Sequence, residues 1–172
     1  HRWLHSIESE VPEEDYRIPI GEAAVIKEGS DITITSLSYM TIEAIHAIEE
    51  LNKMGISCDL IDLRSSNPID WVRIYNSVNK TGKLLALDSS SGSFSVASEI
   101  IACVAMNCHK SLSCSPKRLA LEDMPSPSSF GLTDKYYVGA KEIFDDVLKM
   151  LGKKAFDSSK KFKKDHPHDV PG

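Results

Sequence analysis

The chain has 172 residues, of which 41% are hydrophobic and 26% are charged. A chain of this length buries roughly 70% of its unfolded surface when it folds around one core. The composition therefore excludes a wholly disordered protein and favours one full-sized domain. No apolar run approaches the roughly 18 residues that cross a bilayer, and the first residues lack the apolar core of a signal peptide. We expect a soluble, intracellular protein of the cytoplasm or an organelle matrix, without a membrane span.

The net charge of -5 is distributed unevenly along the sequence. Residues 1–151 carry 14 basic and 22 acidic side chains, whereas residues 152–172 carry six lysines and three aspartates. An acidic body argues against nucleic acid as a partner. The lysine-rich end has no helical or strand periodicity, and Pro167 and Pro171 oppose further helix. We therefore interpret residues 152–172 as a mobile, solvated tail.

The four cysteines, at positions 58, 103, 108 and 114, contain no C-x-x-C pair. Their spacing fits no zinc site and no disulfide framework. Free thiols in a reducing compartment are the favoured interpretation.

The chain begins with a polar, acidic segment over residues 1–16, which is typical of a linker. Apolar segments at 24–26 and 32–37 predict two strands. Because the polar connection between them is short, we expect a hairpin of two antiparallel strands. Apolar residues at helical spacing then predict a helix over about 40–54, which ends at Gly55.

From residue 58 onward, strand and helix patterns alternate. Strands are expected at 58–63, 84–87 and 118–121, and helices at 70–81, 94–108 and about 143–151. Asp70 is a suitable N-cap for the first of these helices, and Gly82 is a suitable stop. Long connections require parallel strands with right-handed crossovers. The predicted fold is a three-layer α/β/α sandwich over residues 17–151, with a five-stranded, mostly parallel sheet that includes one antiparallel strand.

In open α/β sheets, ligands lie beyond the carboxyl ends of the strands. The polar segment Ser89–Ser93 precedes a predicted helix there, where backbone N–H groups could hold a phosphate. The segment lacks both glycine-rich phosphate-binding patterns, so a loop that simply starts a helix is favoured. Cys108–His109 and the strand carboxylates Asp59 and Asp62 show no nucleophile or acid–base arrangement. We therefore assign no catalytic, cofactor-binding or metal-binding residue.

Several segments, whose order and spacing are largely those of one family, carry a family resemblance. They are Tyr16–Gly21, Glu28–Ile34, Ile61–Arg64, Asn67–Asp70, Ser77–Lys83, Asp123–Pro127 and Leu132–Thr133. Together they resemble the carboxy-terminal domain of the beta subunit of thiamine-diphosphate-dependent 2-oxoacid dehydrogenases, of the pyruvate and branched-chain type, within the transketolase-like superfamily. The resemblance covers about residues 1–151, and it implies an α/β/α sandwich with five strands, one of them antiparallel.

The resemblance also implies where the cofactor lies. In the whole enzyme, thiamine diphosphate and Mg²⁺ sit between the alpha subunit and the amino-terminal domain of the beta subunit. Neither region is among these 172 residues, and residues 1–16 resemble the linker that leaves the amino-terminal domain. The whole enzyme decarboxylates a 2-oxoacid and reductively acylates a lipoyl group. We expect this chain to be a noncatalytic assembly domain, inactive alone and without a cofactor of its own.

The partners that the resemblance implies are a second beta subunit, the alpha subunit and the acyltransferase core of the complex. The candidate interface residues are Asp88, Gly92, Phe94, Glu99, Asp123, Pro125, Pro127, Phe130 and Leu132. Each could instead shape a loop or pack a helix, and Phe130 could belong to the core. Two other functions stay open: the equivalent domain of a transketolase or deoxyxylulose-phosphate synthase, and a freestanding binding module.

Overall fold

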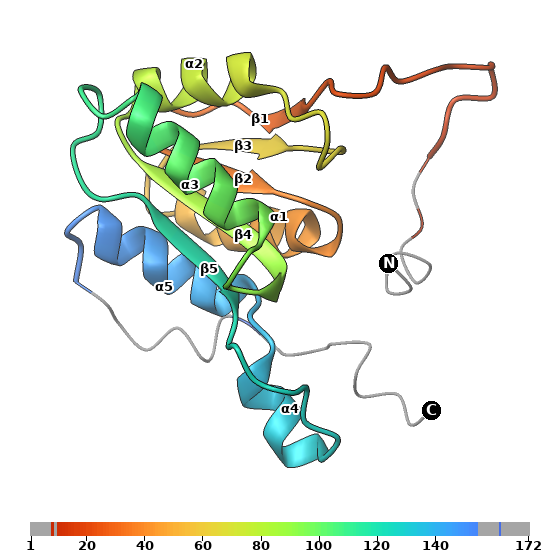
Figure 1. Ribbon diagram of the computed structural model, residues 1–172, viewed down its shortest axis with the longest axis vertical. Helices are drawn as coiled ribbons and strands as arrows, with labels where there is room; N and C mark the ends of the chain where they lie inside the picture. The colour runs from red at the N-terminus through yellow and green to blue at the C-terminus, as the bar shows by residue number, and fades with distance from the viewer. Residues whose placement is uncertain (1–7, 9, 155–161, 163–172) are drawn as a thin grey trace.

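A five-stranded sheet lies between two layers of helices in the computed structural model, which describes residues 8, 10–154 and 162 (Figure 1). The strands are β1 (Ala24–Lys27), β2 (Ile32–Ser36), β3 (Cys58–Asp62), β4 (Leu84–Ser91) and β5 (Lys117–Leu121). The helices are α1 (Tyr39–Asn52), α2 (Trp71–Thr81), α3 (Val96–Asn107), α4 (Phe130–Tyr136) and α5 (Ala140–Met150). The strand order is β1-β3-β2-β4-β5, and β1 alone runs antiparallel to its neighbour.

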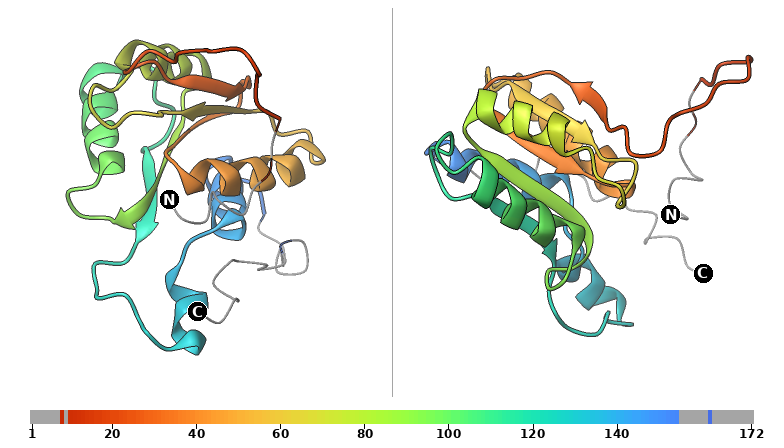
Figure 2. Two further views of the ribbon diagram at one scale, coloured as in Figure 1. Left: turned by 90° about the vertical axis from the view of Figure 1, so that its right-hand side faces the viewer. Right: turned by 45° about the horizontal axis from the view of Figure 1, so that its top comes forward.

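The alternation of side chains along the strands builds two separate cores. In β2, Ile32 and Ile34 face the core that α1 and α5 cover, whereas Thr33 faces α2, where its hydroxyl lies 2.7 Å from that of Ser77. In β4, Leu84 and Ala86 belong to the core beneath α2 and α3. Figure 2 shows these helix pairs on opposite sides of the sheet. The predicted three-layer sandwich is confirmed.

The predicted hairpin of the first two strands is wrong, although β1 is the antiparallel strand. β3 lies between β1 and β2, and β1 pairs with β3. The short connection crosses the start of β3, where the amides of Ser30 and Asp31 both donate to the carbonyl oxygen of Ser57, at 3.1 and 2.9 Å. Neighbouring strands lie about 4.8 Å apart, so four residues easily span two strand spacings. The short connection between β1 and β2 therefore does not require these strands to be neighbours, and β3 lies between them.

The helix predicted at residues 70–81 is α2, and the two residues expected to bound it do so. The Asp70 carboxylate accepts a hydrogen bond from the backbone N–H of Arg73 at 3.1 Å, and Gly82 ends the helix with a φ of 70°. The strand expected at 84–87 continues to Ser91, because its serine-rich end pairs with Leu121 of β5 after a bulge. Helix α4 was not predicted.

The two ends of the chain are described only in part. Residues 1–7 and 9 of the expected linker, and residues 155–161 and 163–172 of the expected tail, lie outside the described residues. Phe162 is described, and its half-buried ring packs against that of Phe144 in α5, with centroids 5.3 Å apart. The domain boundary at residue 151 and the mobility of the tail stay predictions.

Candidate functional site

The carboxyl edge of the parallel strands contains unusual backbone conformations. Ser38, Arg64 and Phe94 have φ angles of 58°, 57° and 56°, and each follows a parallel strand within three residues. A non-glycine residue in this region costs about 1–3 kcal/mol, so the surrounding contacts must impose the conformation. This edge is therefore shaped by its loops rather than by regular secondary structure.

Asp88, in β4, connects the end of this strand to the start of α3. One carboxylate oxygen of this buried residue accepts from the backbone N–H and the hydroxyl of Ser90, at 2.9 and 2.7 Å. The other oxygen accepts from the N–H of Ala97 in the first turn of α3, at 3.2 Å. A carboxylate thus already occupies the positive end of the helix dipole. Ser89–Ser91 form the end of β4, and residues 92–95 connect this strand to α3.

Asp123 joins the loops that follow β4 and β5. Its carboxylate accepts hydrogen bonds from the hydroxyls of Ser91 and Ser93 and from the N–H of Ser93, the last at 3.1 Å. The bonds from Ser91 and Ser93 lower the pKa of Asp123 to about 2. The carboxylate is therefore charged at neutral pH, and it holds the two loops together as one unit.

Gly92 and Phe94 lie within this joined unit. A Cβ atom on buried Gly92 would lie 3.2 Å from a terminal guanidinium nitrogen of Arg118, so the loop approaches that side chain closely. Phe94 is fully exposed, with a solvent-accessible area that is 105% of the reference value for phenylalanine. The loop therefore presents a large apolar ring to solvent from a backbone that its neighbours hold in place.

The segment after β5 projects from the sandwich and ends in α4 (Figure 1). Met124 and Leu132 are 49% and 60% exposed on this segment. The hydroxyl of Tyr136, a buried residue, donates to the carbonyl oxygen of Met124 at 3.3 Å and ties the two ends of the projection together. Phe130 begins α4, but its side chain lies outside the description, so the choice between anchor and core residue stays open.

The structure groups most of the predicted interface residues. Asp88 lies in β4 just before the joined loops, Gly92, Phe94 and Asp123 lie in those loops, and Pro125, Pro127 and Leu132 lie on the projection. Glu99 is exposed on α3, where its carboxylate accepts from the thiol of Cys103 at 3.3 Å. The linking roles of Ser91 and Ser93 were not predicted from the sequence. Their only sequence signal was the accumulation of polar residues at two strand ends.

The other candidate groups for chemistry have structural partners. Asp59 is bonded to Lys80 and Ser77, and Asp62 accepts from the N–H of Arg64. Burial raises the pKa of the Cys108 thiol, which opposes nucleophilic use. No group of three or more His, Cys, Asp or Glu side chains in the described part of the chain could hold a metal ion.

None of the helices in the described residues combines the length and the apolar character needed to pass through a bilayer.

Comparison with known proteins identifies the domain. Residues 21–143 match the family model described as "Transketolase, C-terminal domain". The chain belongs to this family. It is also 37% identical over 145 residues to the 2-oxoisovalerate dehydrogenase subunit beta of Bacillus subtilis, an alignment that covers 84% of the chain and 44% of that relative.

Two further relatives extend the comparison. The chain is 40% identical over 122 residues to the pyruvate dehydrogenase E1 component subunit beta of Staphylococcus epidermidis, covering 71% of the chain and 38% of that protein. A solved "Split gene transketolase, inactive beta4 tetramer" superposes with a TM-score of 0.71 at 28% identity, covering 86% of the chain and 48% of that structure. The transketolase C-terminal domain described here thus spans less than half the length of each of these three relatives.

Proposed function

We propose that this domain is the noncatalytic assembly domain of the beta subunit of a 2-oxoacid dehydrogenase. The observation that carries the proposal is a set of exposed apolar residues on the loops and short helix at the carboxyl edge, Phe94, Met124, Pro125 and Leu132, here called the carboxyl-edge surface. All four residues are exposed and lie on loops or a short helix that Asp123 and Tyr136 fix in place. Such pre-organised loops lose little entropy when a partner covers them.

Known relatives support this proposal. Those at 37% and 40% identity are dehydrogenase beta subunits, and the superposed structure is described as an inactive tetramer of beta chains. In the proposed whole enzyme, thiamine diphosphate and Mg²⁺ bind outside this domain, and the enzyme decarboxylates a 2-oxoacid and acylates a lipoyl group. The domain would contact a second beta subunit, with the alpha subunit and the acyltransferase core as further partners.

A second candidate is the equivalent domain of a transketolase. One observation favours it, because the superposed structure is a split-gene transketolase. The higher identities to dehydrogenase beta subunits favour the first candidate. Both candidates give this domain the same assembly role, and they differ in the reaction of the whole enzyme.

Calorimetry tests the noncatalytic part of the proposal. We expect no saturable heat when thiamine diphosphate and Mg²⁺ are titrated into the chain, because the proposed whole enzyme binds both groups outside this domain. Saturable binding in the low micromolar range would overturn the purely structural role.

Nuclear magnetic resonance at increasing protein concentration tests the assembly surface. Amide shifts of residues 92–95 and 123–136 should move as the chain associates, whereas those of α2 should stay fixed. Shifts confined to α2, or spread evenly over all elements, would contradict the proposed surface.

A further inference from the structure

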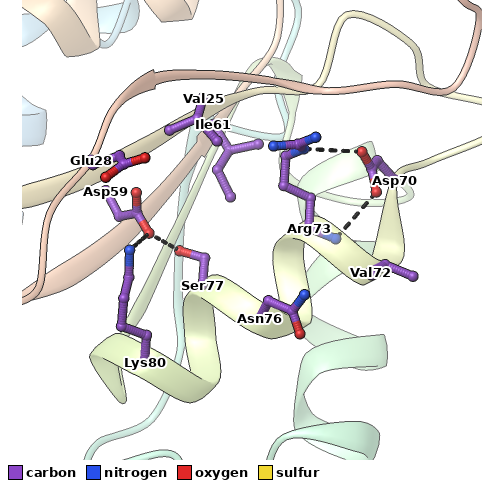
Figure 3. Close-up of a pocket in the computed structure, with 10 residues that line it drawn as sticks. All are labelled: Val25, Glu28, Asp59, Ile61, Asp70, Val72, Arg73, Asn76, Ser77 and Lys80. Carbon is purple, nitrogen blue, oxygen red and sulfur yellow. Dashed lines mark hydrogen bonds and ion pairs between the residues drawn. The ribbon is translucent and has the colours of Figure 1, made fainter.

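A second site lies on a different part of the molecule. A cavity of about 380 Å³, open to solvent, lies between α2 and the edge of the sheet formed by β1 and β3. Val25 and Ile61 supply an apolar wall, and α2 contributes Arg73, Asn76 and Ser77 (Figure 3). This volume is within the range of about 300–1,000 Å³ found for small-molecule sites. None of the carboxyl-edge residues lines the cavity.

One end of the cavity is acidic. The Asp59 carboxylate, only 3% exposed, accepts from the Ser77 hydroxyl at 2.6 Å and pairs with the Lys80 ammonium at 2.6 Å. Figure 3 shows the Glu28 carboxylate beside that of Asp59. Within the described part of the chain, Glu28 has no hydrogen bond or ion pair. Since Lys80 balances Asp59, Glu28 leaves one uncompensated negative charge at this end.

The other end carries a cation with unused donors. The Nε atom of Arg73 donates to an Asp70 carboxylate oxygen at 3.2 Å. Among the described residues, the two terminal nitrogens of this guanidinium have no hydrogen-bond partner. Figure 3 shows the guanidinium extending towards Ile61, across the apolar wall from the acidic end. Arginine presents its terminal N–H groups as a fork that suits a carboxylate.

We propose that this cavity binds a linear ω-amino-carboxylate. The ammonium group lies between Glu28 and Asp59, the carboxylate lies against the free donors of Arg73, and the methylene chain covers Val25 and Ile61. Neither a simple anion nor a simple amine satisfies both ends. A zwitterion does, and it matches a cavity whose five charged side chains sum to one negative charge.

The spacing along α2 sets the length of the ligand. Ser77 and Lys80, which hold Asp59, lie four and seven residues from Arg73. At a rise of about 1.5 Å per residue, these positions are about 6 and 10 Å from Arg73 along the helix. With carbon–carbon bonds of about 1.5 Å, a spacer of about three to five methylene groups covers the shorter distance. The probe that fits is 5-aminopentanoate.

Calorimetry with three probes tests the charge pattern. We expect 5-aminopentanoate to bind the chain saturably, at least about tenfold more tightly than pentanoate or pentylamine. Equal affinity for 5-aminopentanoate and either single-charge probe would overturn the proposal. Absence of saturable 5-aminopentanoate binding up to about 10 mM would also overturn it.

Two variants test the residues. Glu28→Gln should weaken 5-aminopentanoate binding at least about tenfold without changing the melting temperature, because Glu28 is exposed. Arg73→Gln should reduce the affinity for 5-aminopentanoate to that for pentylamine. The matched control is Glu22→Gln, an exposed carboxylate outside the cavity, which should leave the affinity unchanged. Equal effects of Glu28→Gln and Glu22→Gln would contradict the assigned site.

Discussion

Single residues at the carboxyl edge combine an unfavourable backbone with an exposed side chain. Phe94 is the clearest case, since its φ is 56° and its ring contributes almost no burial to this chain. The backbone conformation of Phe94 costs stability in a single chain, and its apolar ring is exposed to solvent. Both properties suit a residue that contacts a partner.

Phe94→Gly should therefore separate stability from association. Glycine adopts a positive φ without steric cost, although it has more freedom to lose on folding. We expect the free energy of unfolding to rise by up to about 1 kcal/mol in urea denaturation, while self-association weakens. Phe94→Ala keeps a Cβ at the same φ and should weaken association without that gain. A clear loss of stability in both variants would show that the ring packs on its own chain.

Asp123 sets the pH range in which the two loops remain joined. Its pKa is lowered to about 2 by the hydroxyls of Ser91 and Ser93 and by the N–H of Ser93. A lowered folded-state pKa means that the charged carboxylate stabilises the joined loops above the ordinary value near 3.8, and that this contribution disappears as pH falls through about 2.

The amide signal of Ser93 should therefore titrate with a midpoint near 2 rather than near 3.8, followed by nuclear magnetic resonance. Asp123→Asn removes the titrating group and should abolish this transition. A midpoint near 3.8 in the unmodified chain would mean that the hydrogen bonds to Asp123 do not hold in solution.

At the scale of elements, the crossing of β1 to β2 over the start of β3 depends on close backbone approach. A Cβ atom on Gly29 would lie 2.2 Å from the backbone carbonyl carbon of Cys58. Since backbone atoms cannot move aside locally, a larger residue must displace the turn from β3. The position of this turn across β3, and with it the order of the strands, thus depends on the absence of a side chain at Gly29.

Gly29→Ala should lower the free energy of unfolding by about 2–3 kcal/mol, measured by thermal or urea denaturation. Gly131→Ala is the matched control, because nothing lies within 4 Å of a Cβ at that position in α4. The control should be neutral or should add up to about 1 kcal/mol through helix propensity. An unchanged stability for Gly29→Ala would contradict the close crossing.

The elements also show what the sequence could and could not predict. Asp70 and Gly82 bound α2 through contacts within a few residues, so local pattern was sufficient there. The insertion of β3 between β1 and β2 depends on contacts between distant segments, such as Asp31 with Ser57, which no local pattern reveals. Helix α4 has seven residues, one of them Gly131, and too few turns to show periodicity.

The candidate site also has some features that local sequence could predict and others that depend on contacts between distant segments. Loops at the carboxyl ends of parallel strands could be expected from topology, and several predicted interface residues lie there. The bonds of Asp123 with Ser91 and Ser93 join positions 30 or more residues apart. Glu28 and Asp59 meet in the cavity only because β1 pairs with β3. Sequence spacing contains no information on either contact.

At the scale of the whole molecule, Phe162, which follows α5 in the sequence, packs against the core. Phe162 packs its ring on Phe144 at a centroid distance of 5.3 Å and a tilt of 60°. Phe162→Ala should lower the free energy of unfolding by about 1 kcal/mol in urea denaturation. Lys153→Ala, an exposed position before that segment, is the control and should have no effect. Equal stability of both variants would show that the ring contact contributes nothing.

The assembly role rests on the carboxyl-edge surface as a contact between chains. Leu132 is 60% exposed on α4 within this surface, and Met106 is 67% exposed near the opposite end of α3. Replacing each by glutamine removes similar apolar area from two different faces. The two variants therefore distinguish a specific surface from general apolar attraction.

Sedimentation equilibrium of the chain and these two variants is the most direct measurement. We predict reversible dimer formation in the unmodified chain, a dimer at least about tenfold weaker in Leu132→Gln, and an unchanged dimer in Met106→Gln. A strictly monomeric chain across a wide concentration range, or equal weakening in both variants, would contradict the assembly role.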